Sequence, residues 1–472
     1  MNSEETPGAN RGIPSSFRDP SGFLYFHDDL IYRQVNIRYK DNYDHLMDSG
    51  LYRTLVQSEL LVPHEEVLIE YAASSEAYKV IKPELIPFVS FPYEWSFSQL
   101  KDAALITLEI QEKALNFGMA LKDGSAYNIQ FRKGKPNLID TLSFEKYREG
   151  QPWVAYRQFC QHFLAPLALM SYADVRLGQL LRVYLDGIPL DLASSLLPFP
   201  TYMRFSLLTH IHLHAKSQRH FGRKSVNTNS RTMTRLAFLG LIDNLKSSIS
   251  KLMWKPQDTE WSNYYVDSNY ASEAFLHKKQ LVTEFLDKMN PRPQCVWDLG
   301  ANIGLFSRIA SDKGILTISC DMDPACVEKN YLECVKNRET HLLPLLLDLT
   351  NPSPSVGWEN RERISFLKRS PADVVLALAL VHHLALSNNL CLQKIAEFFH
   401  QICKWLIIEF VPKNDSQVKR LLLNREDIFP NYTQEVFETE FCKYFRILSA
   451  VRIRQTERTL YWMRRDTSSP RE

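Results

Sequence analysis

The chain has 472 residues, of which 45% are hydrophobic and 23% charged, and its formal net charge is +2. This length suits two or three domains, and the near-neutral charge excludes a strong electrostatic case for nucleic-acid or membrane-surface binding. The sequence has no apolar run of the roughly 18 residues that a membrane span needs, no signal-peptide pattern at its start and no Cys-x-x-Cys pair, so it predicts a reduced, cytoplasmic protein without a zinc site or a disulfide framework.

The first half of the chain begins with a segment that we predict to be flexible, residues 1–20, which are rich in Ser, Pro, Gly and Asn. Further along, residues 88–95 predict a strand followed by a hinge-like turn. Residues 99–117 then predict an amphipathic helix that Gly118 stops.

Three polar residues after this helix have the spacing of a phosphotransfer site. Asp123 and Asn128 are separated by four residues, as in the Asp-x-x-x-x-Asn catalytic loop of kinases. Asp140 lies twelve residues beyond Asn128, at the end of a short strand over 136–139. In such a site Asp123 would orient a hydroxyl group, while Asn128 and Asp140 would hold magnesium on the phosphates of ATP.

The order of strand, hinge, helix, Asp-loop-Asn, hairpin and Asp resembles the core of the kinase-like phosphotransferases, including the aminoglycoside and HipA-type branches. The resemblance covers roughly residues 20–214 and implies an α+β fold, with magnesium-ATP phosphotransfer as one alternative function. Several features depart from the family pattern. The nearest candidate for a glycine-rich loop, residues 19–23, has one glycine, and Asp140 is followed by Thr-Leu-Ser. The candidates for the phosphate-binding cation are Lys79, Lys82 and Arg33.

We therefore predict a degenerate kinase-like domain that acts as a scaffold or a substrate-recognition domain. An unrelated fold, in which Asp123 and Asp140 only form turns, is a further alternative. The alternating His210, His212 and His214 lie in a run that is short of β-branched residues, which favours a helical histidine cluster over a zinc site.

A linker and a connecting helix are predicted between the two halves. Residues 215–235 carry six basic residues and no acidic ones, which is typical of a solvated connector. Apolar residues recur at helical spacing over 236–254, so we predict a helix that leads into the second domain.

The second domain opens with a glycine-containing turn after an apolar strand. Asp298 ends this strand, Gly300, Asn302 and Gly304 form the turn, and a helix is predicted over 305–312. The two glycines carry no Cβ that would keep a ligand from the backbone, and Asn tolerates left-handed dihedral angles. Asp298 is placed to accept a hydrogen bond from a cationic or amide group of the ligand.

Acidic residues also occur at the ends of later strands. A second predicted strand ends in Asp321, 17 residues beyond Gly304, and a third ends in Asp348. A fourth strand follows over 372–378, and a fifth contains Glu409. Strands that alternate with helices predict a parallel sheet with its ligand site at the carboxyl ends of the strands.

These motifs resemble the class I S-adenosylmethionine-dependent methyltransferases over roughly residues 262–466, which implies a Rossmann-like α/β fold, the cofactor S-adenosyl-L-methionine and methyltransferase activity. A dinucleotide site is less favoured, because Asn302 replaces the middle glycine and no second mononucleotide half is visible. Residues 445–451 and 458–463 resemble the antiparallel hairpin that closes such sheets. The resemblance implies these cofactor contacts: Asp298, Gly300, Asn302 and Gly304 around the methionine part, Asp321 at the ribose and Asp348 at the adenine amino group.

Residues 377–384 resemble the strand-four motif of methyltransferases with a His-His-Leu end. His382 or His383 is therefore a candidate general base or substrate contact, while the alternative is that one caps the strand and the other packs beneath the pocket. Glu409 could face the acceptor or bind a backbone group. The absence of an Asn-Pro-Pro-Tyr type motif argues against methylation of an amide or a nucleobase amine and favours an oxygen of a small-molecule or glycan-like acceptor.

Aromatic and basic residues before the first strand, Tyr264, Tyr265, Tyr270 and Lys278, could form a segment that covers the cofactor or could belong to the core. The full arrangement, including residues 151–157 and 409–413, resembles bacterial methyltransferases related to the nodulation protein NoeA. A non-catalytic interaction protein with two degenerate cofactor folds is a further alternative. The predicted organisation is a flexible start (1–20), a kinase-like domain (21–214), a linker with a helix (215–261), a methyltransferase domain (262–466) that could be coupled to the kinase-like domain, and a tail (467–472).

Overall fold

The structure is a computed structural model that describes residues 11–216, 232–256, 272–369, 371–423 and 427–466. Tyr264, Tyr265 and Tyr270 lie outside these residues. Contacts divide the chain into an N-terminal unit, Met1–Lys255 with Ser355–Ile364, and a C-terminal unit, Pro256–Pro354 with Ser365–Glu472.

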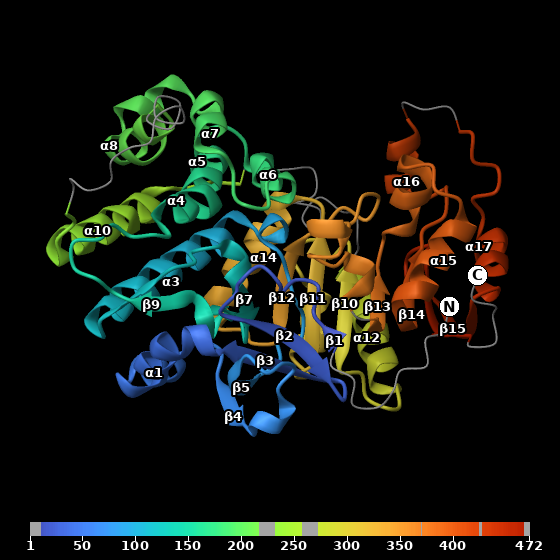
Figure 1. Ribbon diagram of the computed structural model, residues 1–472. Helices are drawn as coiled ribbons and strands as arrows, with labels where there is room; N and C mark the ends of the chain where they lie inside the picture. Colours follow the sequence, from blue (N-terminus) through green and yellow to red (C-terminus); the bar gives the residue numbers. More distant parts are fainter. Residues whose placement is uncertain (1–10, 217–231, 257–271, 370, 424–426, 467–472) are drawn as a thin grey trace. The chain divides into compact units, whose positions relative to one another are not determined.

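The N-terminal unit begins with a five-stranded antiparallel sheet, drawn in blue in Figure 1. Two helices, α1 and α2, lie between its third and fourth strands in sequence. In sheet order the strands are β1 (Arg11–Gly12), β2 (Gly22–His27), β3 (Leu30–Asn36), β5 (Ala77–Pro83) and β4 (His64–Val67). The two helices are α1 (Lys40–Asp48) and α2 (Leu51–Gln57).

A long helix and two small hairpin sheets follow this sheet. Helix α3 (Phe97–Asn116) starts at a capping box, in which Ser96 accepts from the Gln99 N–H and the Gln99 side chain accepts from the Ser96 N–H. The paired strands are β6 (Met119–Leu121) with β9 (Phe144–Lys146), and β7 (Ile129–Arg132) with β8 (Lys135–Leu138). This order of sheet, helix, loop and hairpins confirms the predicted α+β kinase-like fold.

The strand predicted within residues 88–95 is wrong. This segment is irregular and contains a 3-10 turn, Pro92–Glu94. The backbone of Ser90 bonds to the side chain of Gln130 and not to a neighbouring strand. The Ser90 N–H donates to Gln130 Oε1 at 2.9 Å, and the Ser90 carbonyl accepts from Gln130 Nε2 at 2.9 Å. Because one glutamine satisfies both groups, no strand partner is needed.

Several helices follow these hairpins in the N-terminal unit. Helix α10 packs on α3, where Lys246 forms an ion pair with Glu112 and Lys101 donates to the carbonyls of Ser250 and Leu252. The helix predicted before the second domain is thus part of the N-terminal unit. The helices are α4 (Tyr156–Phe159), α5 (Ala165–Tyr172), α6 (Leu180–Val183), α7 (Leu190–Leu196), α8 (Phe205–Leu207) and α10 (Arg235–Lys251).

His210 and His212 are buried in a helical turn, Leu208–Leu213, as the shortage of β-branched residues in this run predicted. Their ring nitrogens contact neighbouring side chains: His210 contacts Tyr156 and Asn244, while His212 contacts Ser194 and Thr201. In the part of the chain that the structure describes, no group of three or more His, Cys, Asp or Glu residues is arranged to hold a metal ion.

The C-terminal unit is built on a seven-stranded sheet (Figure 1). Strands β10 to β14 are parallel, and β16 joins β14 in the antiparallel sense and pairs with β15. In sheet order the strands are β12 (Leu342–Leu346), β11 (Leu316–Asp321), β10 (Cys295–Leu299), β13 (Ala372–Ala377), β14 (Cys403–Phe410), β16 (Thr459–Arg465) and β15 (Phe445–Arg452). This order confirms the predicted Rossmann-like class I methyltransferase fold with its antiparallel hairpin. The order reverses at β10, whose carboxyl end therefore borders the crevice where such sheets bind ligands.

Helices α12 and α13 pack against one face of this sheet, where Val296, Val374 and Ile407 belong to the same buried cluster. None of the helices in the described segments is long and apolar enough to cross a membrane. The helices of this unit are α12 (Ser272–Asp287), α13 (Ser307–Ser311), α14 (Pro324–Asn337), α15 (Leu392–Ile402), α16 (Ser416–Leu422) and α17 (Gln434–Cys442).

The segment 355–364, which we call the excursion, lies between β12 and β13 in sequence but belongs to the N-terminal unit. Val356 and Arg363 pair in a short antiparallel bridge. Glu362 accepts two hydrogen bonds from Arg18, at 2.7 and 3.0 Å, and the Arg363 guanidinium lies 4.6 Å from the ring centroid of Tyr127. The sequence motifs had no signal for this excursion.

Candidate cofactor and active site

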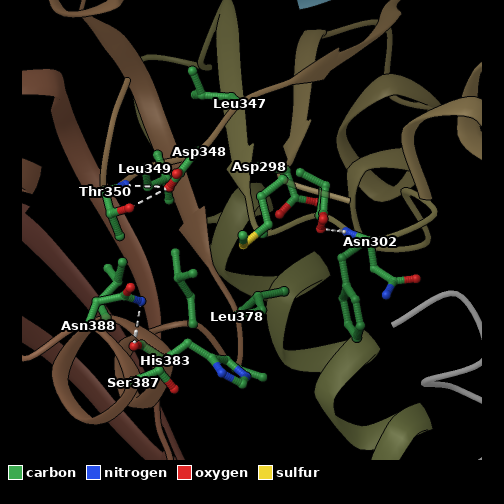
Figure 2. Close-up of a pocket in the computed structure, with 18 of the residues that line it drawn as sticks. Asp298, Asn302, Leu347, Asp348, Leu349, Thr350, Leu378, His383, Ser387 and Asn388 are labelled. Atoms are coloured by element: carbon green, nitrogen blue, oxygen red, sulfur yellow. Dashed lines mark hydrogen bonds between the residues drawn. The ribbon is translucent and has the colours of Figure 1, made fainter. Parts of the chain in front are cut away.

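A cavity of about 350 Å³ lies in the C-terminal unit, within the size range of small-molecule sites. Its walls come from the segments after β10, β11, β12 and β13, together with residues of α12 and α16. Figure 2 shows Asp298 and Asn302 on one side of this space, Asp348 and Thr350 on another, and His383, Ser387 and Asn388 along a third.

The glycine turn after β10 takes the conformation that its residues allow. Gly300, Asn302 and Gly304 have φ values of 76°, 53° and 77°, in the left-handed region. The N–H groups of Gly300 and Ala301 both donate to the carbonyl of Cys320 at 2.9 Å, which ties the turn to the end of β11. Gly300 and Asn302 line the cavity.

Gly304 has a different environment from Gly300. A Cβ on Gly304 would lie 2.5 Å from Oδ1 of Asn330, on α14. Gly304 is also outside the set of residues that line the cavity. Its need for glycine therefore comes from the packing of the turn on α14, and its predicted cofactor contact stays a prediction.

A buried carboxyl group, Asp298, and a half-buried one, Asp321, stand at the ends of β10 and β11. Asp298 accepts a hydrogen bond from Ser307 Oγ at 2.6 Å, and burial raises the pKa of Asp298 to about 7. Burial also raises the pKa of Asp321 to about 6, although the N–H groups of Asn302 (2.7 Å) and Asp323 (2.9 Å) bond to its carboxylate. Both groups line the cavity, so a cationic ligand would favour their ionised form.

The third acid, Asp348, follows β12. Its Oδ1 accepts hydrogen bonds from the N–H of Thr350 at 2.8 Å and from Thr350 Oγ1 at 2.7 Å, drawn as dashed lines in Figure 2. Oδ2 takes part in neither bond. Leu347 and Leu349 flank Asp348 in the cavity wall. An acceptor between apolar walls suits a flat heteroaromatic group with an amino donor.

The turn after β13 forms another part of the cavity wall and includes Leu378, Ala379 and Leu380. Ala379 has a φ of 51°, which is uncommon for a residue with a Cβ and which often marks a functional turn. A Cβ on Gly300 would lie 3.2 Å from Leu380 Cδ1, so the two turns are in close contact. Ala379 was not among the residues predicted from the sequence, because an alanine carries no signal of its backbone conformation.

The two histidines after β13 differ in exposure. His383 lines the cavity and begins a π-helical turn, His383–Ser387, whereas His382 is 1% exposed and is outside the lining. Burial, and then the charge of Arg458, lower the pKa of His383 to about 4, so its imidazole is neutral near pH 7. Of the two candidates for a base, His383 is the one that the cavity reaches.

Glu409 is fully buried and is not part of the cavity lining. Its carboxylate forms ion pairs with Lys278 Nζ at 2.6 Å and with an Arg458 nitrogen at 3.4 Å. Lys278, on α12, lines the cavity. Glu409 can therefore act on a bound ligand only through such a partner.

The kinase-like residues also come together, within the N-terminal unit. Asn128 donates to Ser143 Oγ at 3.3 Å, and Ser143 Oγ donates to Asp140 Oδ2 at 2.5 Å. Burial and the charge of Asp140 raise the pKa of Asp123. Of the three cations that the sequence left open, Arg33 reaches Asp140, with 2.5 Å between its nitrogen and Oδ1.

The carboxylate of Asp140 is bonded by groups of the protein itself. Oδ1 of Asp140 accepts from Arg33 and from the Leu142 N–H at 3.1 Å, while Oδ2 accepts from Ser143. Magnesium binds oxygen ligands that can face it directly. Here the protein's own donors use both oxygens.

Comparison with known proteins gives one strong relative. The nodulation protein NoeA of Rhizobium meliloti (strain 1021) is 35% identical over 461 residues, which cover 96% of this chain and 96% of that protein. No family model matches the chain.

Solved structures overlap only in part. WbdD, in a complex with the kinase inhibitor LY294002, is 15% identical, with 43% of each chain covered and a TM-score of 0.29. Magnesium protoporphyrin IX methyltransferase (ChlM) from Synechocystis PCC 6803, with bound SAH, is also 15% identical, covers 44% of this chain and 93% of that one, and has a TM-score of 0.31. TM-scores this low carry no argument about function. The 35% identity with NoeA over 96% of both chains, in contrast, establishes homology. The chain belongs to the family of the nodulation protein NoeA.

Proposed function

We propose that the C-terminal unit is an S-adenosylmethionine-dependent methyltransferase. The observation that carries this proposal is the placement of three acids, Asp298, Asp321 and Asp348, at the ends of three neighbouring strands around one cavity. Asp298 and Asp321 match the cationic methionine part and the ribose hydroxyls, and Asp348 between leucines matches the adenine amino group. The left-handed turn at Gly300 and Asn302 lets the ligand approach the backbone.

Bound S-adenosylmethionine supplies an activated methyl group for direct displacement by a nucleophile. The residues of this chain would align the acceptor with that methyl group and remove its proton. His383 is the candidate for the base that takes this proton, because its neutral imidazole lines the cavity. Ser387 and Asn388, both exposed at the same wall, offer hydroxyl and amide groups to a polar acceptor. These groups support an oxygen acceptor on a small or glycan-like molecule.

The cofactor is tested by ligand-induced stabilisation. S-adenosylhomocysteine at a hundredfold excess over its Kd should add ~2.7 kcal/mol to the stability of the wild-type unit, and the matched variant Asp140→Ala should keep this gain. Asp321→Ala should lose most of it. If wild type shows no stabilisation at any concentration that saturates known methyltransferases, the proposal fails.

The identity of the methyl acceptor and the role of His383 as a general base need a second measurement. Transfer of a labelled methyl group to hydroxylated small molecules and oligosaccharides would identify the acceptor. We expect His383→Asn to reduce the transfer by about 100-fold or more, the usual range for a general base, and to leave S-adenosylhomocysteine affinity unchanged. Equal rates in wild type and His383→Asn would exclude this histidine as the base.

For the N-terminal unit we infer a scaffold or recognition role. The supporting observation is the use of both Asp140 oxygens by Arg33, Leu142 and Ser143. We expect magnesium-ATP to leave the melting temperature of wild type unchanged. Stabilisation by magnesium-ATP that Asp140→Ala abolishes would instead favour phosphotransfer.

A further inference from the structure

A buried cation forms part of the cavity wall. Lys278 is 4% exposed, and its Nζ lies 4.6 Å from the ring centroid of Phe306 and 2.6 Å from Glu409 Oε2. An ammonium group in such surroundings is costly unless it has an anionic partner, and Glu409 supplies one.

Glu409 does not depend on Lys278 alone. Arg458 also contacts Glu409, and Arg458 is itself held by Asp415 through contacts of 2.7 and 3.1 Å. The side chains of Lys278, Glu409 and Arg458 are at most 5% exposed. Because the four charges alternate in sign, Glu409 would keep a cationic neighbour if Lys278 turned towards another anion.

The same end of the cavity carries the opposite charge. Asp298 lines the wall with Lys278, and the two groups attract each other. An α-amino acid carries an ammonium group and a carboxylate on the same carbon atom. The carboxylate of Asp298 complements the first of these groups, and the ammonium of Lys278 complements the second. Asp348, by contrast, lies among apolar residues after β12.

We propose that Lys278 binds the carboxylate of the cofactor's amino-acid end by exchanging Glu409 for that carboxylate. This inference rests on the proposed function. It makes Lys278 a residue that selects cofactors by their carboxylate, with Glu409 and Arg458 as positioning residues.

The test compares two ligands by isothermal titration calorimetry with the full chain. One is S-adenosylhomocysteine, and the other is S-adenosyl-3-thiopropylamine, the same molecule without its carboxylate. Wild type should prefer S-adenosylhomocysteine by about 10- to 100-fold, the usual range for a hydrogen bond to a charged group. Lys278→Met should bind both ligands with the lower of the two affinities.

Lys278→Met leaves the buried Glu409 with Arg458 as its cationic partner, which could destabilise the fold, so a second variant must control for this loss of stability. The double variant Lys278→Met/Glu409→Gln removes both charges of the pair and should show the same loss of discrimination. Glu409→Gln alone frees Lys278 from its partner, so S-adenosylhomocysteine should bind as tightly as in wild type or more tightly, while the affinity for the decarboxylated ligand stays unchanged.

The outcomes separate this inference from the proposed function. If neither ligand binds wild type, the proposed function is wrong, and the inference falls with it. If both ligands bind wild type equally, or if the double variant weakens both by the same factor, the proposed function stands and the role of Lys278 is overturned.

Discussion

Burial of the Asp298 carboxyl group costs the folded protein free energy. Burial raises its pKa to about 7, far above its ordinary value. A carboxyl group whose pKa is raised on folding destabilises the folded protein as pH rises through that range. A cationic ligand group beside the ionised carboxylate offsets this cost.

We therefore expect the affinity for S-adenosylhomocysteine to depend on pH. Its ammonium group favours ionised Asp298, so the affinity should fall by about tenfold between about pH 8 and pH 6, as the carboxyl group with a pKa of about 7 takes up a proton. Asp321, with a pKa of about 6, should add to the decrease at lower pH. Calorimetric titrations across this range would measure the slope.

The matched control is Asp298→Asn, which can still accept the hydrogen bond from Ser307 but has no charge. This variant should bind weakly at pH 8 and lose most of the pH dependence. It should also melt a few degrees higher than wild type at pH 8, since no carboxylate needs to be buried. An unchanged pH slope in Asp298→Asn would show that another group controls binding.

At the scale of elements, the two turns that meet at the cavity have left-handed backbone, which glycine adopts without strain and alanine does not. Gly304 packs on α14 through Asn330, which also bonds to Arg308 (3.0 Å) and Ser319 (2.9 Å). Asn330 cannot move aside without breaking those bonds. The glycine pattern predicted the turn correctly, but it could not tell a glycine that faces a ligand from one that faces a helix.

Gly304→Ala should destabilise the C-terminal unit by about 2–3 kcal/mol, because it combines an unfavourable φ with a clash against Asn330. Gly314→Ala is the matched control: Gly314 has a φ of 75°, but a Cβ there would meet no other atom within 4 Å, so this variant should lose only about 1 kcal/mol. Urea unfolding would measure both. Equal losses would mean that Asn330 can give way.

The turn at Ala379 allows the opposite substitution. Ala379→Gly removes a Cβ from a left-handed position and should stabilise the unit by about 0.5–1 kcal/mol. The control Ala377→Gly, in the buried strand β13, should destabilise it by a similar amount or more. Unfolding midpoints in urea would decide between these signs, and a loss of stability in Ala379→Gly would show that its Cβ makes contacts that outweigh the strain.

At the scale of the whole molecule, the excursion links the two units by chain connectivity. It leaves the C-terminal unit shortly after Asp348 and contributes Glu362 and Arg363 to the N-terminal unit. Tyr127, which Arg363 contacts, lies between the kinase-like residues Asp123 and Asn128. The predicted coupling between the two domains stays a prediction, for which the excursion offers a physical route.

A fragment of residues 1–255 should melt a few degrees lower than the same fragment with residues 355–364 attached through a flexible linker. The attached segment restores the pair of Arg18 with Glu362 and the contact of Arg363 with Tyr127, together worth about 1–2 kcal/mol. Differential scanning calorimetry would measure the difference. Attaching the segment with Glu362→Ala and Arg363→Ala should give no gain, and a gain that persists there would assign it to other contacts.

Local patterns in the sequence determined the strands of the C-terminal unit, the glycine turn and the acids that end those strands. They did so because hydrophobic periodicity and glycine dihedral angles act over a few residues, and because parallel strands bring their carboxyl ends to one edge. The spacing of three other residues also predicted that they lie in one region: Asp123, Asn128 and Asp140.

Only the tertiary structure decided which of these residues face the cavity. It separated His383 from His382, paired Glu409 with Lys278, and placed Arg33 on Asp140. Each of these outcomes depends on side chains that are distant in sequence, and buried charges choose partners by their positions in space. The periodicity and spacing of residues in the sequence therefore could not predict these pairings.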